Sequence, residues 1–130
     1  MVAGIIVTHG KLAAELLETA STIIGEFSHC HAVTNSSKSP QALYDEVHAL
    51  LESEQDRRCI VFVDYFGGSC SHTCLRIEHA RPETCVISGV NLPMLLAFLN
   101  KRETLSFEDL TGEVVKRGQD SVRILDPSKI

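Results

Sequence analysis

The sequence has 130 residues, with 17 acidic and 12 basic side chains, a formal net charge of −5 and 44% hydrophobic residues. This balance is typical of one globular domain, here residues 1–130, and the scattered basic residues make nucleic acid and anionic membranes poor partners. No apolar run reaches the ~20 residues needed to cross a bilayer, and the N-terminus lacks a basic secretory segment. We therefore expect a cytoplasmic protein without membrane insertion, whose five cysteines are free thiols.

The first part of the chain predicts two strand–helix pairs. The segment VAGIIV predicts a strand that ends at the turn THG, and apolar residues at helical spacing follow it as far as Gly25. The alternating segment at 27–34 predicts a second strand. Ser39 and Pro40 then have the pattern of an N-cap and a first helical residue, which predicts a second helix.

The rest of the chain continues the alternation of strands and helices. The expected elements are a strand at 59–64, a helix from a cap at Ser69 to about His79, a strand at 84–89, a short helix after VNLP, a helix capped by Ser106, and a final strand at 121–125. The run CIVFVD is continuously apolar, which is typical of a strand covered on both faces. The whole pattern predicts an α/β fold with an open, doubly wound, mainly parallel sheet and helices on both faces.

Three polar turns lie where strands of this sheet are expected to end. They are THG after the first strand, DYFGGS after the third and GVNLP after the fourth. The carboxyl ends of parallel strands meet at one edge of a sheet, where helix N-termini offer free N–H groups to a ligand. We therefore expect that edge to bring together four side chains that are distant in sequence: His9, Asp64, Ser69 and Asn91.

His9 has the chemistry of a nucleophile that carries a phosphoryl group. Imidazole has an unperturbed pKa of about 6.5, so at neutral pH one ring nitrogen keeps a lone pair. If Asp64 accepts a hydrogen bond from the other nitrogen, it fixes the tautomer and stabilises the developing positive charge. Gly67 and Gly68 let the backbone approach an anion, and Ser69 adds a hydroxyl. The sequence has no GxxxxGK[ST] loop, so we do not expect ATP to be the donor.

The motifs THG, VDYFGGS and GVNLPML resemble those of the enzyme IIA component of the mannose-type bacterial sugar phosphotransferase system, and the resemblance covers nearly the whole chain. It implies a phosphotransferase component that accepts a phosphoryl group from phospho-HPr on His9 and passes it to a IIB component, without metal, nucleotide or other cofactor. It also implies that Asp64 pairs with His9. The residues expected to bind the phosphoryl group are Thr8, Gly10, Gly67, Gly68, Ser69 and Asn91.

The resemblance further implies a homodimer in which the strand at 121–125 is added to the sheet of the partner. The sequence departs from the family at one position of the site, because Cys70 stands where the family usually has a proline after GGS. The helix thereby loses a residue that is pre-set for its first turn. It gains a backbone N–H that is compatible with anion binding, and a thiol next to the phosphoryl group.

The same residues also fit other functions. His9, Asp64 and Ser69 are the residue types of a hydrolase triad, although GGSCS lacks the last glycine of the G-x-S-x-G elbow. A regulatory domain that reports the phosphorylation state of the system without sugar transport is a further alternative, and Asn91 alternatively only ties loop backbone together. Zinc is a minority hypothesis because the candidate ligands fit no common zinc spacing: Cys70, Cys74, His29 and His31.

Overall fold

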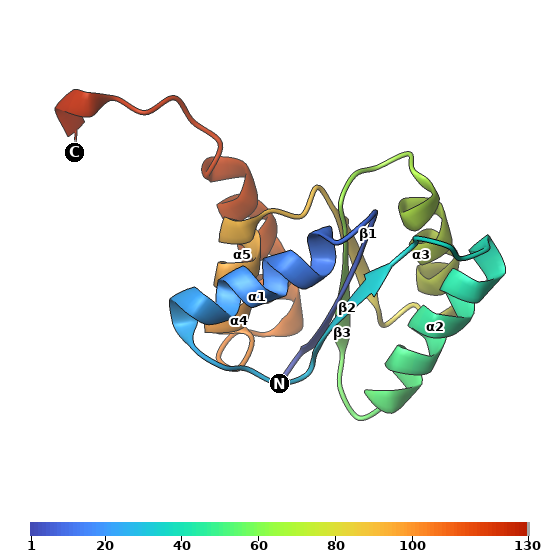
Figure 1. Ribbon diagram of the computed structural model, residues 1–130. Coiled ribbons are helices and arrows are strands. Elements are labelled where there is room, and N and C mark those ends of the chain that lie inside the picture. Colours follow the sequence, from blue (N-terminus) through green and yellow to red (C-terminus); the bar gives the residue numbers. More distant parts are fainter. Residues whose placement is uncertain (130) are drawn as a thin grey trace.

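The structure is a computed structural model that describes residues 1–129. In chain order its elements are β1 (Ala3–Thr8), α1 (Leu12–Ile24), β2 (Cys30–Thr34), α2 (Pro40–Ser53), β3 (Cys59–Val63), α3 (Ser69–Ala80), β4 (Cys85–Ser88), α4 (Leu92–Lys101), α5 (Phe107–Asp120) and a 3-10 turn (Pro127–Lys129). The strands form one parallel sheet in the order β2-β1-β3-β4. Helices α2 and α3 cover one face, and α1, α4 and α5 cover the other (Figure 1). The predicted doubly wound α/β fold is confirmed.

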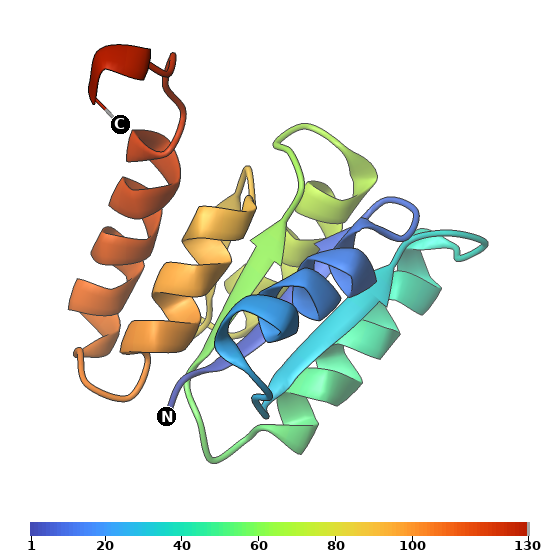
Figure 2. The same ribbon diagram turned by 60° about the vertical axis from the view of Figure 1, so that its left-hand side comes forward.

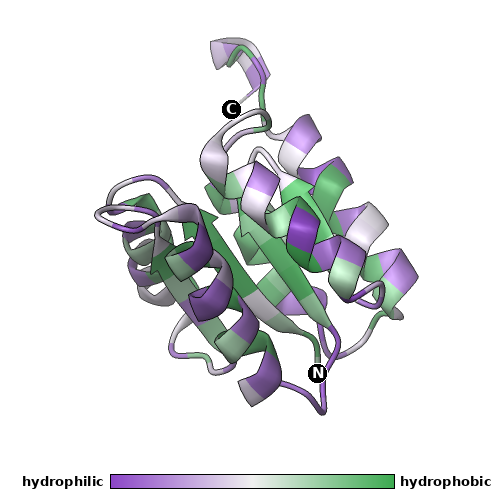
Figure 3. Ribbon diagram, turned by 90° about the vertical axis from the view of Figure 1, so that its right-hand side faces the viewer, coloured by the Kyte–Doolittle hydropathy of each residue, from purple (hydrophilic) through white to green (hydrophobic). Residues whose placement is uncertain are grey.

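Side chains alternate along the strands and so build two hydrophobic layers. In β1, Ile5 and Val7 belong to the layer under α2 and α3, whereas Ile6 belongs to the layer under the other three helices. All five residues of β3 are buried, because this strand is covered on both faces. The hydropathy colouring in Figure 3 shows the same arrangement, with apolar strands between helices whose outer faces are hydrophilic. No helix in residues 1–129 is long and apolar enough to span a membrane.

The helix starts follow the predicted capping signals, with one shift. The hydroxyls of Ser39 and Ser106 accept backbone N–H groups at 3.1 Å and cap α2 and α5. The prediction that Ser69 caps α3 is wrong, since Gly68 adopts the extended backbone of the N-cap and Ser69 is the first helical residue. The hydroxyl of Ser69 is therefore not used to cap the helix.

The final strand predicted at 121–125 is not formed. After α5 the chain runs away from the body of the domain (Figures 1 and 2), and the side chains of Val122, Ile124 and Leu125 are 80%, 98% and 75% exposed. Within residues 1–129, no strand pairs with the outer edge of β4. The strand pattern of this segment therefore has no partner strand within the described chain.

The order of the strands creates a topological switch point between β1 and β3. The chain passes from β1 to β2 on one side, whereas β3 lies on the other side of β1, with Val7 opposite Val63. The turns that follow β1 and β3 therefore lead to helices on opposite faces, α1 and α3, which opens a crevice at the carboxyl ends of these strands. His9 and Asp64 directly follow the two strands and lie at this crevice.

The aromatic pair between α4 and β3 gives a test of core packing. Phe98 is fully buried and packs edge-to-face against Phe62, with ring centroids 5.3 Å apart. Phe98→Ala should lower the free energy of unfolding by about 3–5 kcal/mol, because it leaves a cavity and removes the aromatic contact. Urea denaturation measures this loss. Leu75→Ala, at an exposed position of α3, is the control; equal stabilities of the two variants would contradict the packing described.

Candidate active site at the carboxyl edge of the sheet

The centre of the site is a doubly bonded pair between His9 and Asp64. One carboxylate oxygen of Asp64, Oδ2, accepts the backbone N–H of His9 at 3.0 Å and lies 2.8 Å from its ring Nδ1. The other oxygen accepts the N–H of Tyr65 at 3.0 Å. An ionised carboxylate only accepts hydrogen bonds, so Nδ1 carries the ring proton and Nε2 keeps the lone pair.

The surroundings of Asp64 favour its ionised form. Its side chain is 11% exposed, whereas that of His9 is 41% exposed. Burial alone raises the pKa of Asp64, but the hydrogen bonds from the backbone and ring of His9, together with the Tyr65 N–H, outweigh burial and lower this pKa below its ordinary value. Asp64 is therefore a carboxylate at neutral pH, and it orients a ring that solvent reaches.

The glycine loop after Asp64 approaches the ring closely. Gly67 has a φ of +101°, which only glycine adopts without strain. A Cβ at Gly68 would lie 2.9 Å from the Tyr65 ring and 3.3 Å from Cε1 of His9, so a side chain there would displace one of them. The hydroxyl of Ser71 accepts the N–H of Gly67 at 3.0 Å and donates to the carbonyl of Gly68 at 2.9 Å, which fixes the loop.

The ring of Tyr65 and the loop after β2 complete the edge. The ring of Tyr65 stacks on the ring of His9, with centroids 5.3 Å apart and an interplanar angle of 25°. Ser69 is exposed in the first turn of α3, and its hydroxyl accepts the side-chain amide of Asn35 at 3.3 Å. Figure 2 shows that the loops after β1, β2 and β3 lie at one end of the sheet. The roles of Tyr65, Asn35 and Ser71 were not predicted, because no local pattern indicates contacts between separate loops.

Thr8 and Gly10 flank His9 but differ in accessibility. Thr8 is fully buried, and its hydroxyl accepts the N–H of Ala13 at 2.8 Å, which holds the first turn of α1. Its side chain therefore faces into the protein and does not belong to the exposed edge. Gly10 is exposed and has a φ of +57°, so it turns the chain from β1 into α1 directly beside His9.

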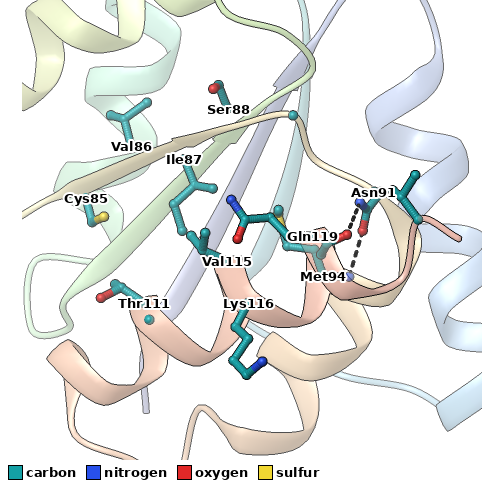
Figure 4. Close-up of a pocket in the computed structure, with 14 residues that line it drawn as sticks. Cys85, Val86, Ile87, Ser88, Asn91, Met94, Thr111, Val115, Lys116 and Gln119 are labelled. Carbon is teal, nitrogen blue, oxygen red and sulfur yellow. Dashed lines mark hydrogen bonds between the residues drawn. The ribbon is translucent and has the colours of Figure 1, made fainter.

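Asn91 is engaged in holding two helices. Its side-chain oxygen accepts the N–H of Met94 at 3.0 Å and caps α4, while its amide donates to the carbonyl of Gly118 at 3.1 Å (Figure 4). The oxygen and the amide nitrogen each have a partner within the fold. The structure thus favours the alternative that Asn91 ties backbone segments together, rather than binding the phosphoryl group.

The structure also bears on the two alternative sites. Within residues 1–129 no hydrogen bond joins His9 to Ser69, so the pairing of a hydrolase nucleophile with its base is not formed. His29 and His31 are not free strand side chains, since both contact the buried carboxylate of Glu54, at 3.1 and 3.0 Å. They lie at the amino end of β2, at the opposite end of the sheet from Cys70. The zinc ligand set considered from the sequence is therefore not brought together.

An imidazole oriented by a carboxylate, at the exposed edge of a parallel sheet and beside a helix N-terminus, defines a candidate group-transfer site. Comparison with known proteins gives the family. The family model EIIA-man, described as PTS system fructose IIA component, matches residues 3–115. The chain belongs to this family of IIA components of the sugar phosphotransferase system, and membership implies a phosphocarrier role in that system.

Individual relatives agree with this assignment. The chain is 32% identical over 127 residues to the mannose-specific EIIAB component of Escherichia coli K12, covering 95% of this chain and 39% of that protein, so it spans about two fifths of that relative. It is 29% identical over 126 residues to the fructose-specific EIIA component of Bacillus subtilis, covering 95% and 86%. The solved mannose/sorbose-specific IIA subunit from Enterococcus faecalis superposes with a TM-score of 0.88 over 95% of this chain and 94% of that one, at 21% identity, and confirms the fold.

The lowered pKa of Asp64 predicts an acid-dependent loss of stability. Because this pKa is lower in the folded than in the unfolded chain, ionised Asp64 stabilises the fold above the unfolded value of about 4, and the contribution is lost as the pH falls below it. Asp64→Asn should therefore flatten the fall in unfolding free energy between neutral pH and pH values below about 4. Urea denaturation across this range measures the slope. Asp56→Asn, at an exposed position, is the control; a slope unchanged by Asp64→Asn would contradict the pairing.

Proposed function

We propose that this protein is a cytoplasmic phosphocarrier that accepts a phosphoryl group from phospho-HPr on Nε2 of His9 and passes it to a IIB component. The observation that carries the proposal is the contact of 2.8 Å between Nδ1 of His9 and Asp64, which leaves Nε2 as the free nucleophile. Neither a nucleotide nor a metal takes part in the transfer. Membership of the IIA family supports the choice of donor and acceptor.

In the transfer, the lone pair of Nε2 attacks phosphorus while the bond from phosphorus to the donor's histidine breaks. The ring of His9 becomes more positive as the new N–P bond forms, and Asp64 stabilises this charge through the proton on Nδ1. The donor's imidazole is the leaving group and keeps the electron pair of the broken bond. In the transfer to the IIB component, the acceptor group of that component attacks phosphorus and the bond from phosphorus to Nε2 breaks. His9 is then the leaving group and keeps the electron pair.

The start of α3 provides the seat for the phosphoryl oxygens. The first N–H groups of a helix have no partner inside the helix and lie at the positive end of its dipole. The first turn of α3 contains no acidic residue, so this positive end is not neutralised. Cys70, unlike the proline usual in the family, contributes an N–H there, and the hydroxyl of Ser69 is exposed beside it. Gly67 and Gly68 complete the seat, and Gly10 borders it.

The surface around His9 suits a protein as the phosphoryl donor. Tyr65 and Phe66 in the loop after β3 are 54% and 75% exposed, and Leu12 at the start of α1 is 44% exposed. Exposed apolar side chains around a reactive group are typical of protein–protein contact surfaces. We therefore propose that these residues contact the protein partners.

We further propose a homodimer in which the C-terminal segments are exchanged. The outer edge of β4 borders a groove of about 880 Å³ against α5, with Ile87 on one wall and Val115 on the other (Figure 4). Val122 lies at this groove, and the exposed residues Val122 and Ile124 alternate with Arg123 and are followed by exposed Leu125. An extended segment from a second copy would supply the missing hydrogen-bond partners of β4 and cover the groove.

Phosphoryl transfer from HPr provides the direct test. With phosphoenolpyruvate, enzyme I and HPr, the wild type should gain one acid-labile phosphate, and His9→Ala should gain none. His72→Ala removes an exposed histidine of α3 and is the matched control, which should be labelled like the wild type. Asp64→Asn should slow labelling at least tenfold, a loss of about 1.4 kcal/mol in transition-state stabilisation, because the tautomer is no longer fixed. Labelling of His9→Ala at the wild-type level would contradict the proposal.

The exchanged dimer is tested by removing the C-terminal segment. A chain that ends at Ser121 should be monomeric in size-exclusion chromatography with light scattering, whereas the full chain should be dimeric. Ile124→Asp should weaken the dimer, since it places a charge in an interface built from apolar side chains. Leu75→Asp, which is exposed on α3 away from the groove, should leave the dimer intact. A monomeric full chain, or a dimeric truncated one, would contradict the exchange.

A further inference from the structure

Three potential metal ligands converge on the inner side of the His9 ring. Nδ1 of His9, a carboxylate oxygen of Asp64 and Sγ of Cys70 all lie within 4.8 Å of one another, and this is the one such group that residues 1–129 contain. Nδ1 is 2.8 Å from Oδ2 of Asp64 and 3.9 Å from Sγ. The phosphoryl transfer proposed above makes no use of the thiol.

We propose that His9, Asp64 and Cys70 form a binding site for a soft divalent cation, which by ligand chemistry is zinc. Imidazole nitrogen, thiolate sulfur and carboxylate oxygen are the three ligand types that zinc takes in proteins, and three protein ligands leave a fourth position for water. Tetrahedral zinc would place Nδ1 about 3.6 Å from Sγ and about 3.4 Å from the carboxylate oxygen. Nδ1 and the carboxylate oxygen would therefore have to move apart by roughly half an ångström, and Nδ1 and Sγ would have to approach by a few tenths of an ångström.

The position of Cys70 in α3 directs its sulfur toward this site. Cys70, Cys74 and Ile77 are fully buried and follow one another along the face of α3 that packs on the sheet. Cys70 is in the first turn, beside the end of β1, where His9 follows. Cys74 is one turn further into the core and does not belong to the cluster. The two cysteines therefore form a matched pair, one inside the site and one outside it.

Binding of the cation is balanced by the release of one proton. Burial and the neighbouring charge of Asp64 raise the pKa of the Cys70 thiol to about 11, so the free protein holds a thiol and the ion replaces its proton. The same negative charge of Asp64 attracts the cation. The side chain of His9 is 41% exposed, so the site borders solvent.

Occupation of the site would stop phosphoryl acceptance, a consequence that rests on the function proposed above. The cation takes the lone pair of Nδ1, so the single proton of the neutral ring lies on Nε2 instead. Nε2 then has no lone pair with which to attack phosphorus. The hydrogen bond from Nδ1 to Asp64 is lost at the same time, because the carboxylate binds the ion. Zinc would thus inhibit the carrier reversibly.

Cobalt(II) is the probe for the site itself, since a thiolate bound to cobalt gives a charge-transfer absorption band. The purified full-length protein should bind one cobalt ion with this band, and zinc should displace it. Cys70→Ser should lose the band and bind cobalt at least ten times more weakly than the wild type. Asp64→Asn should weaken cobalt binding by a similar factor. Cys74→Ser should behave like the wild type, and circular dichroism checks that each variant is folded. An unchanged band in Cys70→Ser, or no band in the wild type, would overturn the site.

Labelling by phospho-HPr tests whether zinc stops phosphoryl acceptance. For each protein, the labelling rate with zinc is compared with the rate of the same protein without zinc. Zinc should reduce wild-type labelling at least tenfold, whereas the ratio for Cys70→Ser should stay near one. Equal inhibition of both proteins would overturn the inhibitory role. If the metal-free wild type is not labelled at all, the proposed transfer fails while the cobalt result still decides the metal site.

Discussion

The site depends on one carboxylate oxygen. Oδ2 of Asp64 accepts both the backbone N–H and the ring N–H of His9, two groups of one residue that lies 55 positions away in the sequence. The first bond fixes the chain at the end of β1, and the second fixes the tautomer and direction of the ring. Both bonds require β1 and β3 to be neighbours in register. The strand order of the sheet therefore also determines which nitrogen of the His9 ring is free to act as the nucleophile.

The rest of the architecture keeps this pair rigid and exposed on one side only. Beneath it, β3 is buried on both faces and the two core layers hold the strands in place. Around it, the glycine loop comes so close that Gly68 has no room for a side chain, and Tyr65 stacks on the ring. The reacting group thus stands on loops that a stiff sheet positions, a common arrangement for catalytic residues.

The sequence predicts the fold and the centre of the site because both follow from local signals. Apolar runs and caps define the strands and helices, and the rule that ligands bind at the carboxyl ends of parallel strands brings His9 to Asp64. The sequence does not reveal where side chains find alternative partners: Thr8 turns inward to hold α1, and Asn91 caps α4. The segment at 121–125 has the pattern of a strand but no partner strand within residues 1–129, and a sequence pattern does not show which chain a strand pairs with.

The most direct test of this account is the protonation of the His9 ring, measured by nitrogen NMR on the metal-free protein at neutral pH and after phosphorylation. We predict that the neutral ring carries its proton on Nδ1, as the bond to Asp64 requires, and that phosphorus couples to Nε2 after transfer. A ring protonated on Nε2, or phosphorus bound to Nδ1, would contradict the central role of the pair.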